Sequence, residues 1–228
     1  MDGNGRWANA HGKPRIFGHR AGMETVRRVL NACRDIGVRY VTLYAFSSEN
    51  WTRPRAEVQA LMHLLREYLE KEVDELDQNG VRLETIGHVE DLPDYARKAL
   101  DDAKRRLAKN DRQVLILALN YGSRREIGDA VRALAGRVER GEIRAAAIDD
   151  EAIRASLDTA PYPDPDLLVR TSGEMRISNF LLYQIAYTEI VVTPTLWPDF
   201  TKEDLLHAIE EYARRERRFG GVGKAEAK

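Results

Sequence analysis

The chain of 228 residues contains one cysteine, Cys33, and no apolar run long enough to cross a membrane. A single thiol can form neither an intrachain disulfide nor a thiolate metal cage, which excludes a disulfide-rich secreted fold and zinc sites built from cysteine. No stretch approaches the roughly 18 consecutive apolar residues of a transmembrane helix, and no signal-peptide pattern is recognised. We therefore expect a cytoplasmic protein with Cys33 in its core.

An excess of positive charge is also absent. Lysine and arginine together number 36, against 37 aspartate and glutamate residues, whereas a protein that coats nucleic acid would be strongly basic. No linker rich in proline, glycine or serine divides the chain, and its length suits one large domain. We expect a single domain over residues 1–219 and a flexible C-terminal tail at 220–228.

Several familiar catalytic motifs are missing as well. The chain has no P-loop motif, no glycine-rich dinucleotide fingerprint after a strand and no GxSxG elbow, which argues against P-loop, Rossmann and serine hydrolase chemistry. Its five histidines form no HxxxH pair. Oxygen ligands remain, so Mg²⁺ is the expected metal if the protein binds one.

The sequence does contain a regular alternation of helical and strand patterns. Apolar residues recur at helical spacing in some segments, and β-branched and aromatic residues cluster in others. Strands that alternate with helices imply a mostly parallel sheet covered on both faces, hence an α/β fold. Helices are predicted over 22–37, 55–78, 92–109, 125–138, 149–157 and 202–218, and strands within 39–51, 81–87, 113–123, 166–170 and 189–194.

The first six residues, MDGNGR, allow two interpretations. Asp2, Gly3, Asn4 and Gly5 all favour turns, so an exposed turn is one of them. The other is an anion site, because glycines let backbone N–H groups approach a ligand and Arg6 can hold phosphate oxygens in a fork. The hexapeptide alone does not decide between them.

Polar and charged residues crowd the loops that follow two predicted strands. FSSENWTR follows the first strand and RTSGEMRIS follows a later one, while HGKPRIFGHRAG adds Arg15, His19 and Arg20 close behind the opening hexapeptide. Ligands of open α/β sheets bind at the carboxyl ends of the strands, so we expect the functional site there.

Six segments together resemble the cis-prenyltransferases of the undecaprenyl diphosphate synthase (isoprenyl transferase) family. They are MDGNGRWA, GHRAG, YAFSSENWTRP, LNYGSR, PDLLVRTSGEMRISNFLLYQIAYTE and LWPDF, in the family's order and spacing over nearly the whole chain. The resemblance implies a single α/β domain whose mostly parallel central sheet, of about six strands, is flanked by helices and borders an apolar tunnel. In relatives a strand ends just before DGNGR, so we expect this first strand to be missing from a chain that starts at Met1.

Members of this family join an allylic diphosphate, commonly farnesyl diphosphate, to successive isopentenyl diphosphates and make each new double bond cis. The resemblance implies a Mg²⁺-dependent transferase, a homodimer that binds no nucleic acid, and a long-chain product used as lipid carrier in cell-wall synthesis. Such a product would bring transient contact with the inner face of the membrane. The alternatives are a short-chain product and a non-catalytic partner subunit. A trans-type synthase would carry DDxxD motifs, and both Asp-Asp pairs here lack the third aspartate.

The resemblance also implies roles for individual residues. Asp2 corresponds to the catalytic carboxylate that holds Mg²⁺, Glu189 to a second metal carboxylate, and Asn50 to a catalytic residue that assists proton removal. The other matched positions correspond to substrate-binding residues. For the allylic diphosphate they are Gly3, Asn4, Gly5 and Arg6, with Arg15 and His19 beside them; for the second diphosphate they are Arg53, Arg170, Arg176 and Ser178. The remaining substrate-binding positions are Trp7, Ser47, Ser48, Glu49, Trp51 and Ile177.

Physical chemistry is consistent with these roles. Two diphosphates repel each other, and arginines with one hard cation supply the opposite charge that brings them together. We expect the dimer interface to use SNFLLYQIAYTEIVV with the neighbouring LWPDF. The helix predicted over 55–78 has a wide apolar face, and we expect it to line the tunnel as well as the core with Val58, Leu61, Met62, Leu65 and Leu69.

Overall fold

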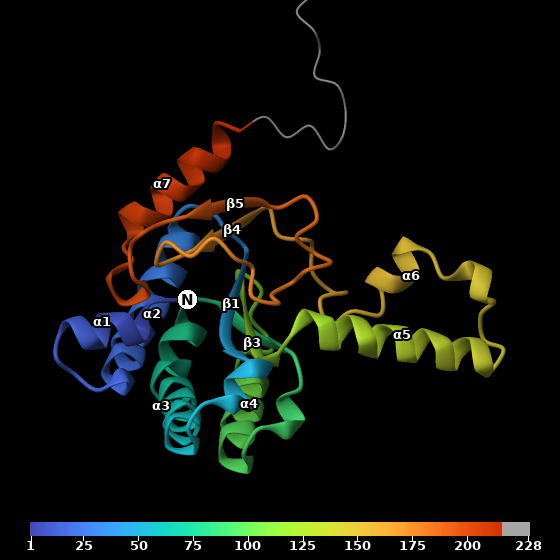
Figure 1. Ribbon diagram of the computed structural model, residues 1–228, viewed down its shortest axis with the longest axis horizontal. Coiled ribbons are helices and arrows are strands. Elements are labelled where there is room, and N and C mark those ends of the chain that lie inside the picture. The colour runs from blue at the N-terminus through green and yellow to red at the C-terminus, as the bar shows by residue number, and fades with distance from the viewer. Residues whose placement is uncertain (216–228) are drawn as a thin grey trace, which may run out of the picture.

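The computed structural model describes residues 1–215 of the chain (Figure 1). In this part of the sequence, helices and strands alternate as predicted. The helices are α1 (Asn4–Ala10), α2 (Arg15–Asp35), α3 (Arg55–Gln78), α4 (Asp94–Leu107), α5 (Ser123–Glu139), α6 (Asp150–Arg154) and α7 (Lys202–Ala213). The strands are β1 (Tyr40–Ser47), β2 (Val81–Ile86), β3 (Gln113–Tyr121), β4 (Leu167–Arg170) and β5 (Glu189–Val192), and short 3-10 turns include η1 (Ser48–Thr52), η2 (Val89–Asp91) and η4 (Trp197–Asp199).

Every strand pairing among the described residues is parallel, as predicted. β3 lies between β1 and β2, and β4 pairs with β5. The prediction of one α/β domain with parallel strands flanked by helices is confirmed. The strands form two sheets, of three and two strands, instead of one sheet of about six.

β3 is the central strand of the larger sheet. All of its residues are buried, and their side chains alternate between the two faces. Leu115, Leu117 and Leu119 belong to the main core with α2, α3 and α4, whereas Val114 and Ile116 belong to a smaller cluster on the opposite face. Because β1 and β2 both run parallel to β3, the loops that follow these two strands lie on either side of its carboxyl end.

The segment SNFLLYQIAY helps to cover the opposite face of this sheet. It forms turns rather than a helix or strand, and Leu181 and Ile185 are buried in the smaller cluster. Leu182 and Tyr187 stay exposed, at 37% and 66%. This segment thus contributes to the core of its own chain and keeps some apolar surface.

The predicted contribution of LWPDF to a dimer interface stays a prediction, but its two aromatic rings offer little surface to a partner. Trp197 and Phe200 are 6% and 2% exposed and belong to the main core. The Trp197 indole N–H donates to the Gly22 carbonyl of α2 at 2.8 Å, so the segment is tied to its own chain.

Proline and glycine mark the ends of α3. Pro54 precedes its first residue, and Gly80 lies just beyond its end with φ +70°, a backbone region that glycine adopts without strain. Both boundaries agree with the prediction. α2 in contrast starts at Arg15, well before the predicted Gly22, because the glycines of GHRAG interrupt the apolar pattern without interrupting the helix.

Two further differences concern the ends of the chain. The sequence did not indicate α1, whose N-cap is Gly3 with φ +103°. α7 ends at Ala213, short of the predicted Arg218. Arg218 and the predicted flexible tail 220–228 lie outside the described residues.

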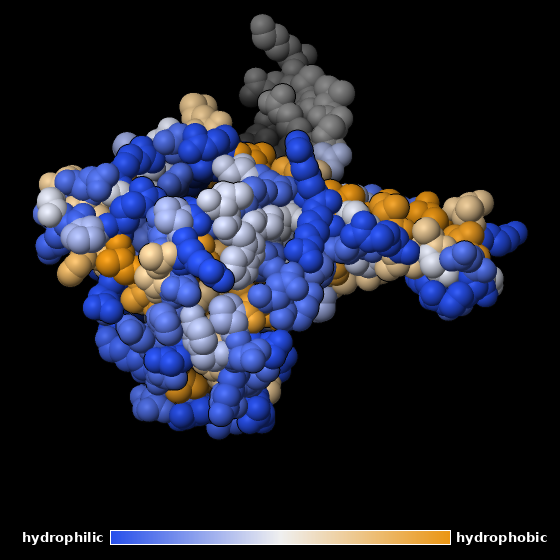
Figure 2. All heavy atoms as spheres, turned by 60° about the horizontal axis from the view of Figure 1, so that its bottom comes forward, coloured by the Kyte–Doolittle hydropathy of each residue, from blue (hydrophilic) through white to orange (hydrophobic). Residues whose placement is uncertain are grey.

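The molecular surface is mostly hydrophilic in the view of Figure 2. Apolar patches gather on the arm that α5 and α6 form beside the body of the molecule (Figures 1 and 2), where Val131 is 57% exposed. Across residues 1–215, no helix has the length and apolar character that crossing a membrane requires.

Candidate active site

A cavity of about 210 Å³ lies between α2, α3 and the carboxyl halves of β1 and β3. Its polar lining comes from Asp2, Gly3, Asn4, Gly5, Arg15, His19, Asn50 and Arg53. Its apolar lining includes Met23, Val26, Leu43, Phe46, Leu61, Met62, Leu64, Leu65, Tyr68, Leu117, Leu119 and Trp197. The cavity therefore joins a polar mouth to an apolar interior, as expected for the tunnel.

Two glycines of the GHRAG segment let α1 lie directly on α2. A Cβ at Gly18 would stand 1.9 Å from the Asn4 carbonyl oxygen, and one at Gly22 would stand 2.4 Å from Asn4 Oδ1. A Cβ at Gly5 would stand 2.8 Å from the Arg15 guanidinium. Gly18 and Gly22 have no room for a side chain, whereas at Gly5 the Arg15 guanidinium would have to move. The two helix glycines hold the start of α1 over the cavity mouth.

Asp2 is anchored through both its backbone and its side chain. Its N–H donates to Thr171 Oγ1 at 2.9 Å, and its carbonyl accepts the Trp197 N–H at 3.0 Å. Its carboxylate accepts the Gly3 N–H at 2.8 Å and Arg170 Nη2 at 3.1 Å. Burial raises the pKa of Asp2, but the hydrogen bonds from Arg170 and Gly3 outweigh burial and hold this pKa below its ordinary value. The carboxylate is therefore ionised at neutral pH, and each oxygen retains a second lone-pair direction.

Glu57 brings two arginines together at the α2–α3 side of the mouth. Arg53 Nη1 donates to Glu57 Oε1 at 3.1 Å, and Arg15 Nε lies 3.5 Å from the same oxygen. Both arginines line the cavity. We call Arg15, Arg53 and Glu57 the first cationic cluster.

Glu174 brings a second pair of arginines together on the other side of Asp2. Arg6 Nη2 lies 3.0 Å from Glu174 Oε1, and Arg176 also binds this carboxylate. Arg6 donates to Ser172 as well, and Arg176 Nη2 lies 4.0 Å from Asp2 Oδ2. We call Arg6, Arg176 and Glu174 the second cationic cluster. Arg6 thus lies with the residues matched to the second diphosphate, although the resemblance assigned it to the allylic one. Arg53 lies in the first cationic cluster with Arg15, although the resemblance assigned it to the second diphosphate.

Arg170, at the end of β4, connects the second cationic cluster to Asp2. Its side chain is only 14% exposed and donates Nη2 to Asp2 and Nη1 to Ser178 Oγ, at 3.0 Å, and to the Arg176 carbonyl. The structure therefore gathers Asp2, Arg170, Arg176 and Ser178, which lie far apart in the sequence.

The 3-10 turn η1 carries the predicted residues that follow β1. Asn50 lines the cavity, and its Oδ1 accepts the Ser47 N–H at 3.2 Å. Ser48 Oγ donates to Glu49 Oε2 at 3.3 Å, while Asn179 Nδ2 donates to Glu49 Oε1 at 2.7 Å. This turn is thereby tied to the residue after Ser178, on the opposite side of the site.

Trp51 lies one layer outside the cavity. Its ring packs edge to face on Phe46, with centroids 5.1 Å apart, and Phe46 lines the cavity. The Trp51 indole N–H donates to Asn120 Oδ1 at 2.7 Å, and 39% of the residue remains exposed.

Trp7 and Ile177 are among the predicted residues that are not part of the cavity lining. Trp7 donates its indole N–H to Asp199 at 2.7 Å and packs against His11, with ring centroids 4.1 Å apart. Ile177 packs against the smaller apolar cluster behind the sheet. Trp7, on α1, and Ile177, next to Arg176 in the chain, are therefore peripheral to the cavity mouth.

Glu189 is not part of the cavity lining, whereas Asp2 is, and the expected pair of metal carboxylates stays a prediction. Glu189 begins β5 and pairs with Leu167, whereas Arg170, the residue that contacts Asp2, pairs with Val192 at the other end. Three residues of strand correspond to about 10 Å. Glu189 instead accepts a hydrogen bond from Arg215 at 2.8 Å. Only Asp2 of the predicted metal ligands lies at the mouth.

His19 has a buried ring nitrogen, Nε2, without a hydrogen-bond partner among the described residues. Burial, together with the positive charges of Arg53 and Arg15, lowers the pKa of His19 to about 4, although Glu57 opposes this shift. His19 is therefore neutral at neutral pH in the folded chain. His19 itself is one of the residues that line the cavity.

His19 should make the folded chain sensitive to acid. Its pKa is about 4 when folded against 6.5 as reference, so the unfolded chain binds the extra proton first and stability falls as pH decreases from about 6.5 to 4. At about 1.4 kcal/mol per pKa unit, the loss is at most roughly 3 kcal/mol. We expect His19→Asn to lose less stability than the parent between pH 7 and pH 4 in urea unfolding. His207→Asn, on the exposed face of α7, serves as the control, and equal pH dependence of parent and His19→Asn would contradict this origin.

α3 supplies one wall of the cavity, as predicted, but with a partly different set of residues. Leu61, Met62 and Leu65 line it, and Leu64 and Tyr68 do so as well. The other two predicted residues, Val58 and Leu69, are buried in the main core and are not part of the cavity lining.

Several residues of the site were not predicted. Thr171 and Ser172 lie within the quoted RTSGEMRIS segment, and Ser172 has φ +78°, but short polar residues carry no distinctive pattern. Glu57 and Glu174 hold the arginine pairs and read as ordinary surface charges in the sequence. Asn179 also went unnoticed, because only its contact with η1 reveals its position.

Comparisons with known proteins agree with this geometry. The family model described as "Putative undecaprenyl diphosphate synthase" matches residues 1–220. An isoprenyl transferase of Heliobacterium mobile is 54% identical over 222 residues, which cover 97% of this chain and 85% of the relative. An isoprenyl transferase of Rhizobium meliloti is 50% identical over 222 residues, which cover 97% of this chain and 90% of the relative.

Two solved structures share the fold. Lavandulyl diphosphate synthase from Lavandula x intermedia, in complex with dimethylallyl diphosphate, has a TM-score of 0.93 and 35% identity, covering 96% of this chain and 95% of that one. A "probable undecaprenyl diphosphate synthase" from Campylobacter jejuni has a TM-score of 0.78 and 33% identity, covering 88% and 92%. The chain therefore belongs to the undecaprenyl diphosphate synthase family of cis-prenyltransferases and is a prenyltransferase.

Proposed function

We propose that this chain condenses isopentenyl diphosphate with an allylic diphosphate, in the first instance farnesyl diphosphate, and makes the new double bond cis. The cavity is the observation that carries the proposal. Its mouth gathers an ionised aspartate and arginines, and its interior is apolar. A prenyl diphosphate has the same division between an anionic head and an apolar tail, and burying the tail contributes about 0.8 kcal/mol per CH₂.

The two cationic clusters suit two diphosphates that must lie side by side. We assign the allylic diphosphate to the backbone of residues 3–5 and to the first cationic cluster. We assign the diphosphate of isopentenyl diphosphate to the second cationic cluster with Arg170 and Ser178. Each charge-assisted hydrogen bond contributes roughly 1.5–3 kcal/mol, so four or five arginines can offset the repulsion between the two anions. When a substrate binds, Glu57 and Glu174 would release guanidinium N–H donors of the arginines that they hold in the absence of substrate.

The mouth also fits one Mg²⁺ ion. Mg²⁺ is held through one or two carboxylates, with phosphate oxygens and waters completing its shell, and Asp2 supplies an ionised carboxylate between the two clusters. Asn4 Oδ1 is a second buried oxygen there without a partner among the described residues. When bound, the ion would supply positive charge for the diphosphate that leaves. Arg170 would orient the Asp2 carboxylate through its hydrogen bond.

Proton removal is assigned to a diphosphate oxygen oriented by Asn50. An amide is a weak base, and Asn50 Oδ1 already accepts the Ser47 N–H. The preorganised donors at the mouth would stabilise the charge that builds on the leaving diphosphate as the allylic C–O bond breaks.

We propose a long-chain polyprenyl diphosphate, a lipid carrier for cell-wall synthesis, as the product. A short-chain product is the second candidate, and the size of the cavity favours it. At about 210 Å³, the cavity is only moderately larger than a 150 Å³ cavity that accommodates benzene. Tyr68 lines both this cavity and a small pocket of about 10 Å³ behind it, where Arg27 pairs with Glu72. A long product would require α3 and Tyr68 to move outward.

The activity is tested by incubating the chain with farnesyl diphosphate, radiolabelled isopentenyl diphosphate and Mg²⁺, followed by sizing of the extracted products. We expect extension of the allylic substrate, and we expect a chelator to abolish it. Asp2 lines the cavity mouth, Arg170 and Arg176 lie beside it, and Arg6 shares Glu174 with Arg176, which argues against a non-catalytic partner subunit. A complete lack of extension would favour that alternative.

We further propose a homodimer that is cytoplasmic, binds no nucleic acid and contacts the inner face of the membrane when it delivers product. Leu182, Tyr187 and Ile190 are exposed apolar residues within the predicted interface segment. Light scattering at micromolar concentration should give about twice the chain mass of 26.0 kDa. A stable monomer would remove the dimer.

A further inference from the structure

A bulge places Asn120 at the carboxyl end of β3. Phe46 of β1 pairs with Leu119 and the next residue, Ser47, pairs with Tyr121, so Asn120 is an extra residue on β3. It is 1% exposed and has φ +47°, a region that asparagine adopts more readily than most residues. Bulges beside functional sites redirect side chains, and this one turns an amide into the space behind Trp51.

The Asn120 side chain bridges Trp51 to the turn that follows β2. Its Oδ1 accepts the Trp51 indole N–H at 2.7 Å, and its Nδ2 donates to the His88 carbonyl at 2.9 Å and to Asp91 Oδ2 at 3.2 Å. The indole can only donate, while the carbonyl and the carboxylate can only accept, so one amide orientation satisfies all three partners. Asn120 is therefore a rigid link between η1 and η2.

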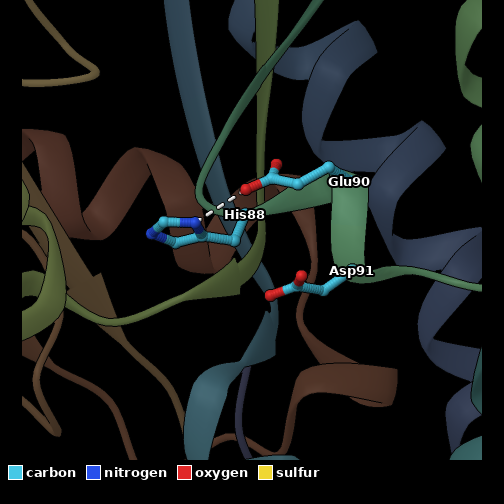
Figure 3. Close-up of side chains that lie close together, drawn as sticks. All are labelled: His88, Glu90 and Asp91. Carbon is cyan, nitrogen blue, oxygen red and sulfur yellow. Dashed lines mark hydrogen bonds and ion pairs between the residues drawn. The ribbon is translucent and has the colours of Figure 1, made fainter.

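The far end of this link is well anchored. Figure 3 shows His88, Glu90 and Asp91 close together around η2. The two ring nitrogens of His88 lie 2.8 Å from Glu90 Oε1 and 2.8 Å from Asp129 Oδ2, and Arg125 binds Asp91 at 3.3 Å. These contacts use both ring nitrogens of His88 and one carboxylate oxygen of Asp91, so the turn serves as a support for Asn120.

We propose that Asn120 is a positioning residue for substrate binding, and that it acts by holding the Trp51 ring against Phe46 at the edge of the cavity. The inference rests on the proposed function, in which the prenyl substrate occupies the cavity that Phe46 lines, and on the substrate-binding role that the resemblance implies for Trp51. Trp51 is partly exposed, and within the described residues its indole nitrogen is fixed by Asn120 alone. Without this hydrogen bond the ring is free to rotate away from Phe46, and the cavity wall that Phe46 forms loses its support.

Two variants each remove one partner of the hydrogen bond between Trp51 and Asn120 without straining the backbone. Asn120→Gly tolerates the left-handed conformation, and Trp51→Phe keeps a ring but deletes the N–H donor. We expect each to raise the KM for farnesyl diphosphate about five- to tenfold, with kcat changed less than twofold, because binding is weakened before the chemical step. The double variant should be no worse than Trp51→Phe, because both changes remove the same bond.

Asn110 provides a matched control. It is also a buried asparagine, 8% exposed, and its Nδ2 donates to Asp77 and to the Val81 carbonyl, at the amino end of β2 and away from the cavity. Asn110→Gly should lower the melting temperature comparably but leave KM unchanged. Asn120→Asp is a second test of the link. Its carboxylate would face the His88 carbonyl and Asp91 and could not donate to them, while aspartate tolerates the left-handed backbone at this position.

An NMR spectrum of the indole N–H groups tests the hydrogen bond between Trp51 and Asn120 without an activity assay. The three tryptophans donate to different acceptors, Trp7 to Asp199, Trp51 to Asn120 and Trp197 to the Gly22 carbonyl, and Trp51→Phe identifies the signal of Trp51 in a ¹H–¹⁵N correlation spectrum. In Asn120→Gly this signal should shift while the other two stay in place, and Asn110→Gly should move none of them.

The outcomes separate this inference from the proposed function. An unmoved Trp51 signal in Asn120→Gly, a KM no higher than that of Asn110→Gly, or additive effects in the double variant would each overturn the positioning role. A parent chain that fails to extend farnesyl diphosphate would instead contradict the proposed function, and the spectrum would still decide whether Asn120 holds Trp51.

Discussion

Replacing Asp2 by alanine should lower kcat by about two to three orders of magnitude while the chain stays folded. Asp2 is the only carboxylate of the predicted metal pair that lies at the cavity mouth, and its pKa is held below the ordinary value by Arg170. Its loss removes the proposed anchor for the cation that offsets charge on the leaving diphosphate, an effect of about 10²–10³ in rate for comparable electrostatic groups. Initial rates of chain extension at saturating substrates measure the effect.

The control for Asp2→Ala is another ion-paired aspartate. Asp35 lies at the end of α2 and pairs with Lys202 at 2.9 Å, away from the cavity. Asp35→Ala should keep the parental rate. Melting curves for both variants separate loss of chemistry from loss of fold. Near-normal turnover in a folded Asp2→Ala chain would show that the carboxylate has no such role.

Replacing Leu65 by tryptophan should shorten the products while the first condensation survives. Leu65 is buried on α3 and lines the apolar part of the cavity, so a larger ring there fills space that the growing prenyl chain would occupy. Leu61→Trp, one helical turn earlier, should act in the same way. Leu65→Met keeps the volume and serves as the control. Sizing of the extracted products by chromatography measures the effect.

The opposite change at the far end of the cavity completes this prediction. Tyr68→Ala removes the ring that separates the cavity from the small pocket beside Arg27 and Glu72, and products should become longer. Unchanged product lengths in Leu61→Trp, Leu65→Trp and Tyr68→Ala would show that α3 does not limit the chain.

Local patterns in the sequence predicted the parts of the fold that local chemistry determines. Gly80 and Pro54 mark the ends of α3, and the apolar residues of β3 mark a strand buried on both faces. α1 escaped prediction because its glycines and asparagine favour a turn by themselves. The helix is stable only because Gly18 and Gly22 let it pack on α2, a contact between segments that no local pattern records.

The site was predicted to the extent that its residues lie in matched motifs. Asp2, Arg15 and Arg170 lie around one cavity mouth. Glu189 does not, because its distance from Asp2 depends on the register of β4 and β5, and register is a property of the pairing rather than of either strand. The bulge at Asn120 was missed for the same reason, since it is defined only relative to β1.

The most direct test of the account is the geometry of the double bond that the enzyme makes. The chain is incubated with farnesyl diphosphate, ¹³C-labelled isopentenyl diphosphate and Mg²⁺, and the dephosphorylated product is analysed by NMR. The account predicts that every newly formed double bond is cis. Products with trans bonds, or no product from a folded chain, would contradict it.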